Sequence, residues 1–304
     1  MSMVTRGDPS SNNFKTRFAP SPTGFLHLGH AFSALTAFDM AKAAGGKFLL
    51  RMEDIDTVRC KPEFEDAIYE DLAWLGIDWE TPVRRQSERL EVYHDGLETL
   101  KARNIAYRCF KTRKEITDDI ARAPHLSAHG PDGPIYIGEM LSAMEERSQL
   151  AAGRNFAWRL SMQKAKALLG NSFDTFTFEE LGKGPNGETG SIKATPQIFG
   201  DVVIGRKDNG TSYHLACVLD DADQGITHVV RGNDLFPASH LHRLLQNLLA
   251  LPTPVYCHHH LITDESGKRF SKRDQSVTLR ALRADGVTPD DIRKRLVLAP
   301  SSSV

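Results

Sequence analysis

The first regular stretch of the chain combines a strand, a loop rich in proline and glycine, and a helix in direct succession. Residues 14–19 (FKTRFA) have strand character and end at the breaker segment 20–24 (PSPTG). From Leu26 to Ala41 the apolar residues recur at three- and four-residue intervals, which is typical of an amphipathic helix. This order of elements is the building unit of α/β proteins, so it favours that fold class from the start.

The same alternation continues. Residues 47–52 (KFLLRM) form a second short apolar run, and helical periodicity follows at 64–75, ending at Gly76, and again at 87–102. Strands that alternate with helices predict a doubly wound parallel sheet of the Rossmann type.

The pattern loosens between residues 111 and 191, where several prolines interrupt it and 182–190 (GKGPNGETG) is too rich in glycine for regular structure. Regular apolar content returns at 201–204, 213–219 and 226–230, and a helix is expected at 239–249. We therefore expect five parts, the last including two short helical segments. They are a disordered leader (1–13), the first half of the Rossmann unit (14–105), an inserted module (106–198), the second half (199–260) and a C-terminal segment (261–304).

Composition limits the class of protein. The chain has 304 residues, with 38 Lys and Arg against 39 Asp and Glu, which excludes a uniformly cationic nucleic-acid binder but not a local basic face. No apolar run of about 18 residues and no apolar N-terminal signal is present, so we expect a cytoplasmic protein. The four cysteines form no CxxC pair and are expected to be reduced: Cys60, Cys109, Cys217 and Cys257.

The tetrapeptide His27-Leu28-Gly29-His30 lies where the first loop becomes a helix. The first N–H groups of a helix lack internal partners and carry the positive end of the helix dipole, so this turn suits an anionic phosphate. Gly29 allows a flat ligand to approach the backbone, and two imidazoles three positions apart share one face of the helix. The position predicts phosphate contacts, although the same four residues alone are equally compatible with an ordinary surface.

Residues 17–31 (RFAPSPTGFLHLGHA) resemble the first signature of class I aminoacyl-tRNA synthetases of the glutamate type. Near the end of the chain, residues 268–273 (KRFSKR) resemble the Lys-Met-Ser-Lys-Ser loop of that family. Ser271 and Lys272 match this loop, whereas Arg269, Phe270 and Arg273 depart from it. Intermediate blocks also match at 51–56, 213–216, 220–222 and 230–234, so the resemblance covers nearly all of 16–273.

Full-length members of the glutamate type continue into an anticodon-binding region, whereas only residues 274–304 remain here, too few for an independent core. The chain therefore resembles the truncated members of this family, the glutamyl-queuosine tRNA(Asp) synthetases. The resemblance implies activation of L-glutamate by ATP without tRNA, and transfer of glutamate to queuosine in the anticodon arm of tRNA(Asp). It also implies Mg²⁺ accompanying ATP; we expect a monomer without membrane contact.

The resemblance also assigns roles to residues. His27 and His30 are expected to contact the phosphates, and Lys272 to stabilise the transferring group; these three are the predicted catalytic residues. Gly29 and Ser271 complete the predicted ATP site. The predicted glutamate site consists of Arg17, Phe18, Ala19, Pro20, Ser21, Glu53, Tyr213 and Arg231.

Within the glutamate site, Arg17 and Arg231 are expected to bind the carboxylates, Tyr213 to add a hydroxyl, and Glu53 to pair with the α-ammonium group. Outside their motifs these residue types are more often structural, with Arg231 in an ion pair, Tyr213 in the core and Glu53 capping a helix.

The truncated members often hold zinc in the insert through Cys-x-Cys and Tyr-x-x-x-Cys. The corresponding positions are Cys109, Lys111, Tyr136 and Met140, and lysine and methionine are poor zinc ligands. We therefore predict that the metal is absent here, with Cys109 and Tyr136 as remnants of the site. The histidine-rich segments 240–242 and 257–260 lack a tetrahedral ligand set and are not expected to bind metal.

Two alternatives remain open: a truncated glutamyl-tRNA synthetase that charges tRNA(Glu), and a noncatalytic paralogue that binds adenylate or tRNA. The altered Arg269 and Arg273 leave room for the second. A generic nucleotide-binding Rossmann enzyme is disfavoured because no GxGxxG follows the first strand. Basic groups near residues 84–89, 111–114 and 293–295 are candidate phosphate contacts, but such runs are most often solvated helix faces.

Overall fold

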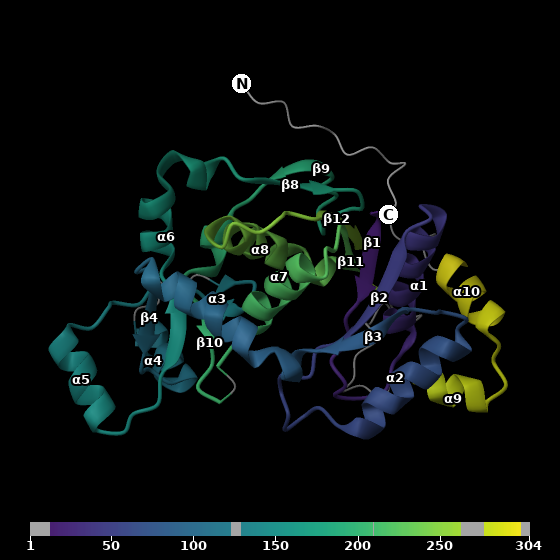
Figure 1. Ribbon diagram of the computed structural model, residues 1–304, viewed down its shortest axis with the longest axis horizontal. Coiled ribbons are helices and arrows are strands. Elements are labelled where there is room, and N and C mark those ends of the chain that lie inside the picture. Colours follow the sequence, from purple (N-terminus) through teal and green to yellow (C-terminus); the bar gives the residue numbers. More distant parts are fainter. Residues whose placement is uncertain (1–12, 123–128, 209, 263–276, 299–304) are drawn as a thin grey trace.

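The computed structural model describes residues 13–122, 129–208, 210–262 and 277–298 (Figure 1). It begins with a parallel sheet in the order β1-β2-β3. Its strands are β1 (Lys15–Phe18), β2 (Lys47–Met52) and β3 (Glu80–Arg85). The helices of this half are α1 (Leu28–Ala43), α2 (Pro62–Trp74) and α3 (Leu90–Ala102). Helix α1 buries Ala31, Ala34, Leu35 and Phe38, which is the face that the sequence periodicity predicts.

A second sheet has the order β11-β12-β8-β9, and only its edge strand β9 is antiparallel. Its strands are β8 (Thr177–Glu180), β9 (Gly190–Lys193), β11 (His228–Gly232) and β12 (Val255–His259). The helices are α7 (Tyr213–Asp223) and α8 (Phe236–Leu248).

The two sheets meet where β11 begins. The Lys15 N–H donates to Thr227 Oγ1 (2.8 Å), and the Thr227 N–H donates to the Lys15 carbonyl (3.1 Å). The combined order β3-β2-β1-β11-β12 is that of a doubly wound α/β fold, whose ligands bind beyond the carboxyl ends of the strands where the order reverses. The predicted fold class is confirmed, and the reversal lies between β1 and β11.

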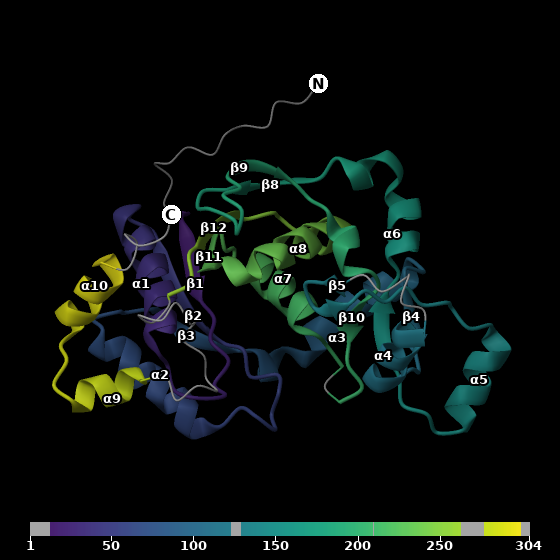
Figure 2. The same cartoon turned by 180° about the vertical axis from the view of Figure 1, so that it is seen from behind.

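The chain between these halves forms an antiparallel sheet in the order β10-β7-β4, together with a short hairpin and three helices. Its strands are β4 (Ala106–Cys109), β5 (His129–Gly130), β6 (Gly133–Pro134), β7 (Ala157–Leu160) and β10 (Val202–Gly205). The helices are α4 (Arg113–Arg122), α5 (Ala143–Ala151) and α6 (Met162–Leu169). Figure 2 shows α4 and α5 at the end of the molecule opposite α9 and α10. Because β8 and β9 lie in the second sheet, residues 106–198 contribute to two sheets, and the five-part division remains a proposal.

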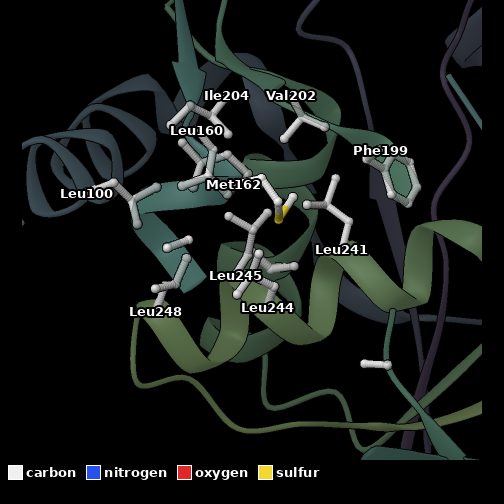
Figure 3. Packing of buried hydrophobic residues seen from close by; sticks show 14 of the residues in the cluster. Leu100, Leu160, Met162, Phe199, Val202, Ile204, Leu241, Leu244, Leu245 and Leu248 are labelled. Carbon is white, nitrogen blue, oxygen red and sulfur yellow. The ribbon is translucent and has the colours of Figure 1, made fainter. Parts of the chain in front are cut away.

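Two large apolar clusters support these sheets. One joins α3, the antiparallel sheet and α8; Figure 3 shows Leu100, Leu160 and Leu245 within it. The other joins α1, α2 and β2 to α9 (Leu279–Ala284) and α10 (Pro289–Leu298), so the end of the chain completes the core of its beginning. Among the described residues, no helix has the length and apolarity needed to cross a membrane.

Candidate active site

The first turn of α1 is capped by its own histidines. The Gly29 N–H donates to His27 Nδ1 (3.1 Å), the His27 N–H donates to His30 Nδ1 (3.2 Å), and the ring centroids are 3.8 Å apart. Because both Nδ1 atoms accept hydrogen bonds, each ring in its neutral form carries its proton on Nε2. A Cβ atom on Gly29 would lie 3.1 Å from His27 Cε1, so a larger residue would press on that ring. The turn thus combines two ring donors with a helix N-terminus, as a phosphate site requires.

Ser271 and Lys272 lie outside the described residues, but both ends of the segment that contains them are placed. Before it, His259 Nε2 is 2.8 Å from Ser33 Oγ, and the His260 ring lies 4.9 Å from that of Phe32. After it, the Leu279 N–H donates to the Leu26 carbonyl (2.8 Å). The described chain on either side of the lysine signature therefore lies beside the loop and first turns of α1.

A buried cluster of two arginines and two carboxylates lies between the ends of β1 and β2 and helix α7. Arg17 Nε donates to Asp221 Oδ1 (3.0 Å), and Arg51 Nη1 donates to the same oxygen (2.7 Å). Arg51 Nη2 also donates to Glu53 Oε1 (3.2 Å). Although burial acts to raise it, the pKa of Asp221 is held well below its ordinary value by the two guanidinium groups. Burial raises the pKa of Glu53, and Arg51 opposes this shift.

Arg231, in β11, is the other predicted glutamate-binding arginine and is only 5% exposed. Its Nη1 atom donates to the Oη atom of Tyr213 (3.5 Å), and Tyr213 is the first residue of α7. Burial raises the pKa of Tyr213 above its ordinary value, and Glu53 and Arg17 also act on it electrostatically. The structure thus gathers Arg17, Glu53, Tyr213 and Arg231 at the ends of β1, β2 and β11.

The loop after β1 connects these groups to the imidazole pair. The Glu53 N–H donates to the Pro20 carbonyl (3.0 Å), which ties the end of β2 to this loop. Phe18 is buried in the apolar cluster of α1, Ala19 is partly buried and Ser21 is exposed. Phe18 therefore has a packing role, while residues 19–21 pass directly between β1 and the turn that carries His27.

The sequence analysis assigned no roles to Arg51, Asp221 or His258, which complete this buried network. A signal was present for two of them. Arg51 is a charge inside the apolar strand KFLLRM, and Asp221 lies on a helix face with Cys217, which is buried. A charge at a buried position needs a partner, so each of these residues indicated that a partner exists, without identifying it.

The expected zinc remnants are neighbours, but the full set of donors does not fit the metal. Cys109 Sγ donates to Tyr136 Oη (3.7 Å), and Met140 packs on the small apolar cluster of Cys109 with Tyr107 and Ile116. Lys111 Nζ donates to Asp119 instead (2.8 Å). Within the described ranges, no group of three His, Cys, Asp or Glu residues is arranged to hold a metal ion.

Most of the basic residues proposed as phosphate contacts are already in ion pairs. Arg84 and Arg89 both contact Asp223, and Arg293 contacts Asp39. A second basic surface, which the sequence analysis missed, surrounds a cavity of about 380 Å³ between α3, β7 and the end of β10. Its lining includes two aromatic and five cationic side chains: Phe156, Trp158, Lys101, Arg108, Arg154, Arg206 and Lys207. Three of these cations are also in ion pairs, Lys101 with Glu98, Arg108 with Glu146 and Arg154 with Glu115.

Known proteins that are similar to this chain include the tRNA synthetases for glutamate and their relatives. Residues 13–302 match the family model for the catalytic domain of class I tRNA synthetases (E and Q). The chain is 50% identical to the glutamyl-Q tRNA(Asp) synthetase of Rhodobacter capsulatus, over 93% of this chain and 99% of that protein. It is 37% identical to the glutamate–tRNA ligase of Aquifex aeolicus, over 93% of this chain but 56% of that protein.

A solved structure of a glutamate tRNA ligase from Elizabethkingia meningosepticum, in complex with its amino acid, superimposes with a TM-score of 0.69. Its sequence is 29% identical, and the match covers 86% of this chain and 52% of that one.

Proposed function

Because the chain belongs to the class I tRNA synthetase family for glutamate and glutamine, we propose that it is a ligase of the glutamyl-queuosine tRNA(Asp) type. It activates L-glutamate with ATP, without any tRNA, and then transfers glutamate to queuosine in the anticodon arm of tRNA(Asp). The product is an ester of glutamate with the modified base. The similarity to the R. capsulatus protein over almost the whole of both chains favours this acceptor over tRNA(Glu).

In the first step an oxygen of the glutamate α-carboxylate attacks the α-phosphorus of ATP. The new P–O bond forms as the bond to the bridging oxygen breaks, and pyrophosphate leaves. Negative charge builds on the phosphoryl oxygens, so alignment and preorganised donors supply most of the rate enhancement. In this proposal His27 and His30 donate from Nε2 to phosphate oxygens, Gly29 leaves room for the nucleotide, and Ser271 and Lys272 approach from the late signature.

In the same proposal, the protein provides opposite charges for both the carboxylate and the ammonium groups of glutamate. Arg231 and Tyr213 face the side-chain carboxylate, and Glu53 faces the α-ammonium group. Arg17 was expected to bind a carboxylate of glutamate, but its Nε and Nη2 atoms donate to Asp221, so we propose that it shapes the wall of the site instead. Mg²⁺ accompanies ATP and neutralises its phosphates, bound mainly through those phosphates and water. The observation that carries the proposal is that the donor pair at the start of α1 and the buried arginine of β11 lie on either side of the reversal point of one sheet.

We place the RNA on the basic cavity beside α3. Lys101 Nζ and the Arg108 guanidinium each lie 4.6 Å from the centre of the Trp158 ring, so cationic and aromatic side chains are in direct contact there. Such a combination suits phosphates together with unpaired bases. Replacing Arg206 and Lys207 together by alanine should weaken binding of the tRNA(Asp) anticodon arm and reduce its salt dependence, while glutamate activation without RNA is unchanged.

We further propose that the protein is a cytoplasmic monomer that works without zinc. Replacement of two zinc-ligand positions by Lys111 and Met140 supports the last point. Elemental analysis of the purified protein should find less than stoichiometric zinc, and a chelator should leave its unfolding temperature unchanged. Zinc at one atom per chain would contradict this part.

The function is tested with labelled glutamate. The protein should catalyse glutamate-dependent exchange of pyrophosphate into ATP with no RNA present, and then label tRNA(Asp) that contains queuosine. Queuosine-free tRNA(Asp) and tRNA(Glu) are the controls and should stay unlabelled. Label on tRNA(Glu) would instead indicate a truncated glutamyl-tRNA synthetase, and absence of exchange would indicate a noncatalytic paralogue.

A further inference from the structure

We propose that Glu180 and His258 act as a positioning pair that fixes the Arg231 guanidinium, and that this pair sets the preference for glutamate over glutamine. The inference rests on the proposed function, because it assumes that Arg231 binds the substrate's side-chain carboxylate. Neither Glu180 nor His258 was assigned a role by the sequence motifs. His258 lies in β12, which pairs in parallel with β11, the strand that carries Arg231, and Glu180 lies in β8, which pairs in parallel with the other side of β12.

Glu180 is buried and is fully engaged by β12 and the loop after β8. Its Oε1 atom accepts the His258 N–H (2.8 Å) and the Gly182 N–H (2.8 Å). Its Oε2 atom lies 2.5 Å from His258 Nδ1. A carboxylate that accepts three hydrogen bonds in a buried site is held rigidly, so it defines the orientation of the imidazole.

The hydrogen-bond directions along this chain have one consistent assignment. Arg231 Nε lies 3.1 Å from His258 Nε2, and an arginine nitrogen can only donate. His258 Nε2 must therefore accept, which places the imidazole proton on Nδ1, where the Glu180 carboxylate receives it. Burial lowers the pKa of His258 to about 4, so the neutral ring that this assignment requires is the form present near neutral pH.

The pair occupies the Nε edge of the guanidinium, and each Nη atom has one hydrogen besides the one that it donates to Ser239 or Tyr213. Nε donates to His258 and Nη2 donates to Ser239 Oγ (2.7 Å), while the Tyr256 ring lies 5.2 Å from Cζ. The Nη1 atom points instead to Tyr213 Oη. A carboxylate can accept two parallel hydrogen bonds from the Nη1–Nη2 end, whereas an amide has one acceptor oxygen and meets a donor with its NH₂ group.

The glycine-rich loop contributes to the same arrangement. A Cβ atom on Gly182 would lie 2.0 Å from the His258 carbonyl oxygen, so only glycine lets this loop pass close enough to donate to Glu180. The first residue of the segment 182–190 therefore supports the position of His258, and through it that of Arg231.

The substitution Glu180→Gln tests the pair without changing its shape. In one amide orientation the NH₂ group faces His258 Nδ1–H, and in the other it faces the two backbone N–H groups, so a donor opposes a donor in both cases. The matched control is Glu179→Gln on the same strand, which changes an exposed carboxylate.

We expect Glu180→Gln to raise the KM for glutamate about 10- to 100-fold in pyrophosphate exchange, as for a lost hydrogen bond to a charged group. The KM for ATP should stay within about threefold, and the ratio of kcat/KM for glutamate over glutamine should fall. His258→Gln, which can accept from Arg231 and donate to Glu180, should keep most of the discrimination, whereas His258→Phe should lose it. If Glu180→Gln does not fold, the comparison of His258→Gln with His258→Phe tests the pair instead.

An unchanged glutamate KM in a folded Glu180→Gln or His258→Phe variant would overturn the inference, as would an equal rise in both KM values. Arg231→Gln separates this result from failure of the proposed function. If Arg231→Gln leaves glutamate activation intact, the assignment of the glutamate site is wrong. If it abolishes activation while Glu180→Gln has no effect, only the positioning role is wrong.

Discussion

Asp221 receives hydrogen bonds from Arg17 and Arg51 at once, and all three side chains are almost completely buried. Desolvating three charges is costly, and the cost is recovered only while the geometry stays intact. The cluster therefore fixes the relative positions of β1, which carries Arg17, of α7, which begins with Tyr213, and of the end of β2, which Glu53 follows directly. Its contribution is specificity of the local structure around the proposed glutamate site.

Asp221→Asn should lower the free energy of unfolding by about 3–5 kcal/mol, because it leaves two buried guanidinium groups with one charge partner fewer. The control is Asp223→Asn, which removes an exposed carboxylate from pairs with Arg84 and Arg89 and should cost less than about 1 kcal/mol. Urea unfolding of both variants measures the difference. Equal values would show that the buried cluster is not a structural constraint.

His27 combines a capping role with the proposed contact to phosphate, and His27→Asn separates them. Asparagine is a good helix N-cap, so the unfolding temperature should stay close to that of the parent protein. The Nε2 donor is lost, and pyrophosphate exchange should slow by about 10²-fold. His94→Asn, on the exposed face of α3, serves as the control. A normal exchange rate for His27→Asn would remove His27 from the proposed ATP site.

At the level of elements, α2 and α9 meet around an unusual carboxylate. Asp71 is completely buried, and neither of its oxygens accepts a hydrogen bond from the described residues; Arg283 Nη2 lies 4.0 Å away. Burial raises the pKa of Asp71 to about 6. The folded protein therefore binds this proton more tightly than the unfolded chain does.

The free energy of unfolding should consequently fall as the pH rises from about 4 to about 6, through the contribution of Asp71, and level off above that range. Asp71→Asn should remove this fall. The free energy of unfolding of the variant, relative to that of the parent protein, should therefore be up to about 2–3 kcal/mol higher at pH 7 than at pH 4. Denaturant unfolding of both proteins at the two pH values measures it. If the two proteins differ in their free energy of unfolding by the same amount at pH 4 and at pH 7, the raised pKa of Asp71 is contradicted.

Periodicity and breakers predicted the elements of the first half well. The apolar spacing of α1, the run KFLLRM of β2 and the stop at Gly76 all correspond to observed elements, because each buries a face or ends at a glycine with positive φ. The place of β8 was not predictable. Thr177–Glu180 is short and not strongly apolar, and it joins β12 through contacts distant in sequence.

The candidate active site was predictable only where its residues belong to local sequence motifs. His27, Glu53, Tyr213 and Arg231 belong to motifs, and the structure brings the last three together with Arg17. The partners that hold them, such as Asp221, Glu180 and His258, come from other strands and helices, and their roles depend on tertiary contacts that local patterns do not encode.

At the scale of the whole molecule, the two ends of the chain form one core. Leu279 and Ile292 are fully buried against α1 and α2, so the C-terminal helices complete the first half (Figure 1). The pairing of Leu279 with Leu26 also places this end beside the turn that carries His27. Stability of the core and the position of the chain that follows residue 276 are thereby linked.

Ile292→Ala should lower the free energy of unfolding by about 2–5 kcal/mol, as expected for truncation of a fully buried side chain. The control is Arg293→Ala at the next residue of the same helix, which removes an exposed ion pair with Asp39 and should lower the free energy of unfolding by less than about 1 kcal/mol. Chemical unfolding of both variants tests this. A small effect at Ile292 would show that α10 is dispensable for the core.

In the proposed active site, the start of α1, the buried arginine of β11 and the late lysine surround one glutamyl-adenylate. A crystal structure with a non-hydrolysable glutamyl-adenylate analogue measures this most directly. We predict the phosphate-equivalent group within hydrogen-bond distance of His27, His30 and Lys272, and the side-chain carboxylate on the Nη1–Nη2 end of Arg231. An analogue bound elsewhere, or with its carboxylate away from Arg231, would contradict the account.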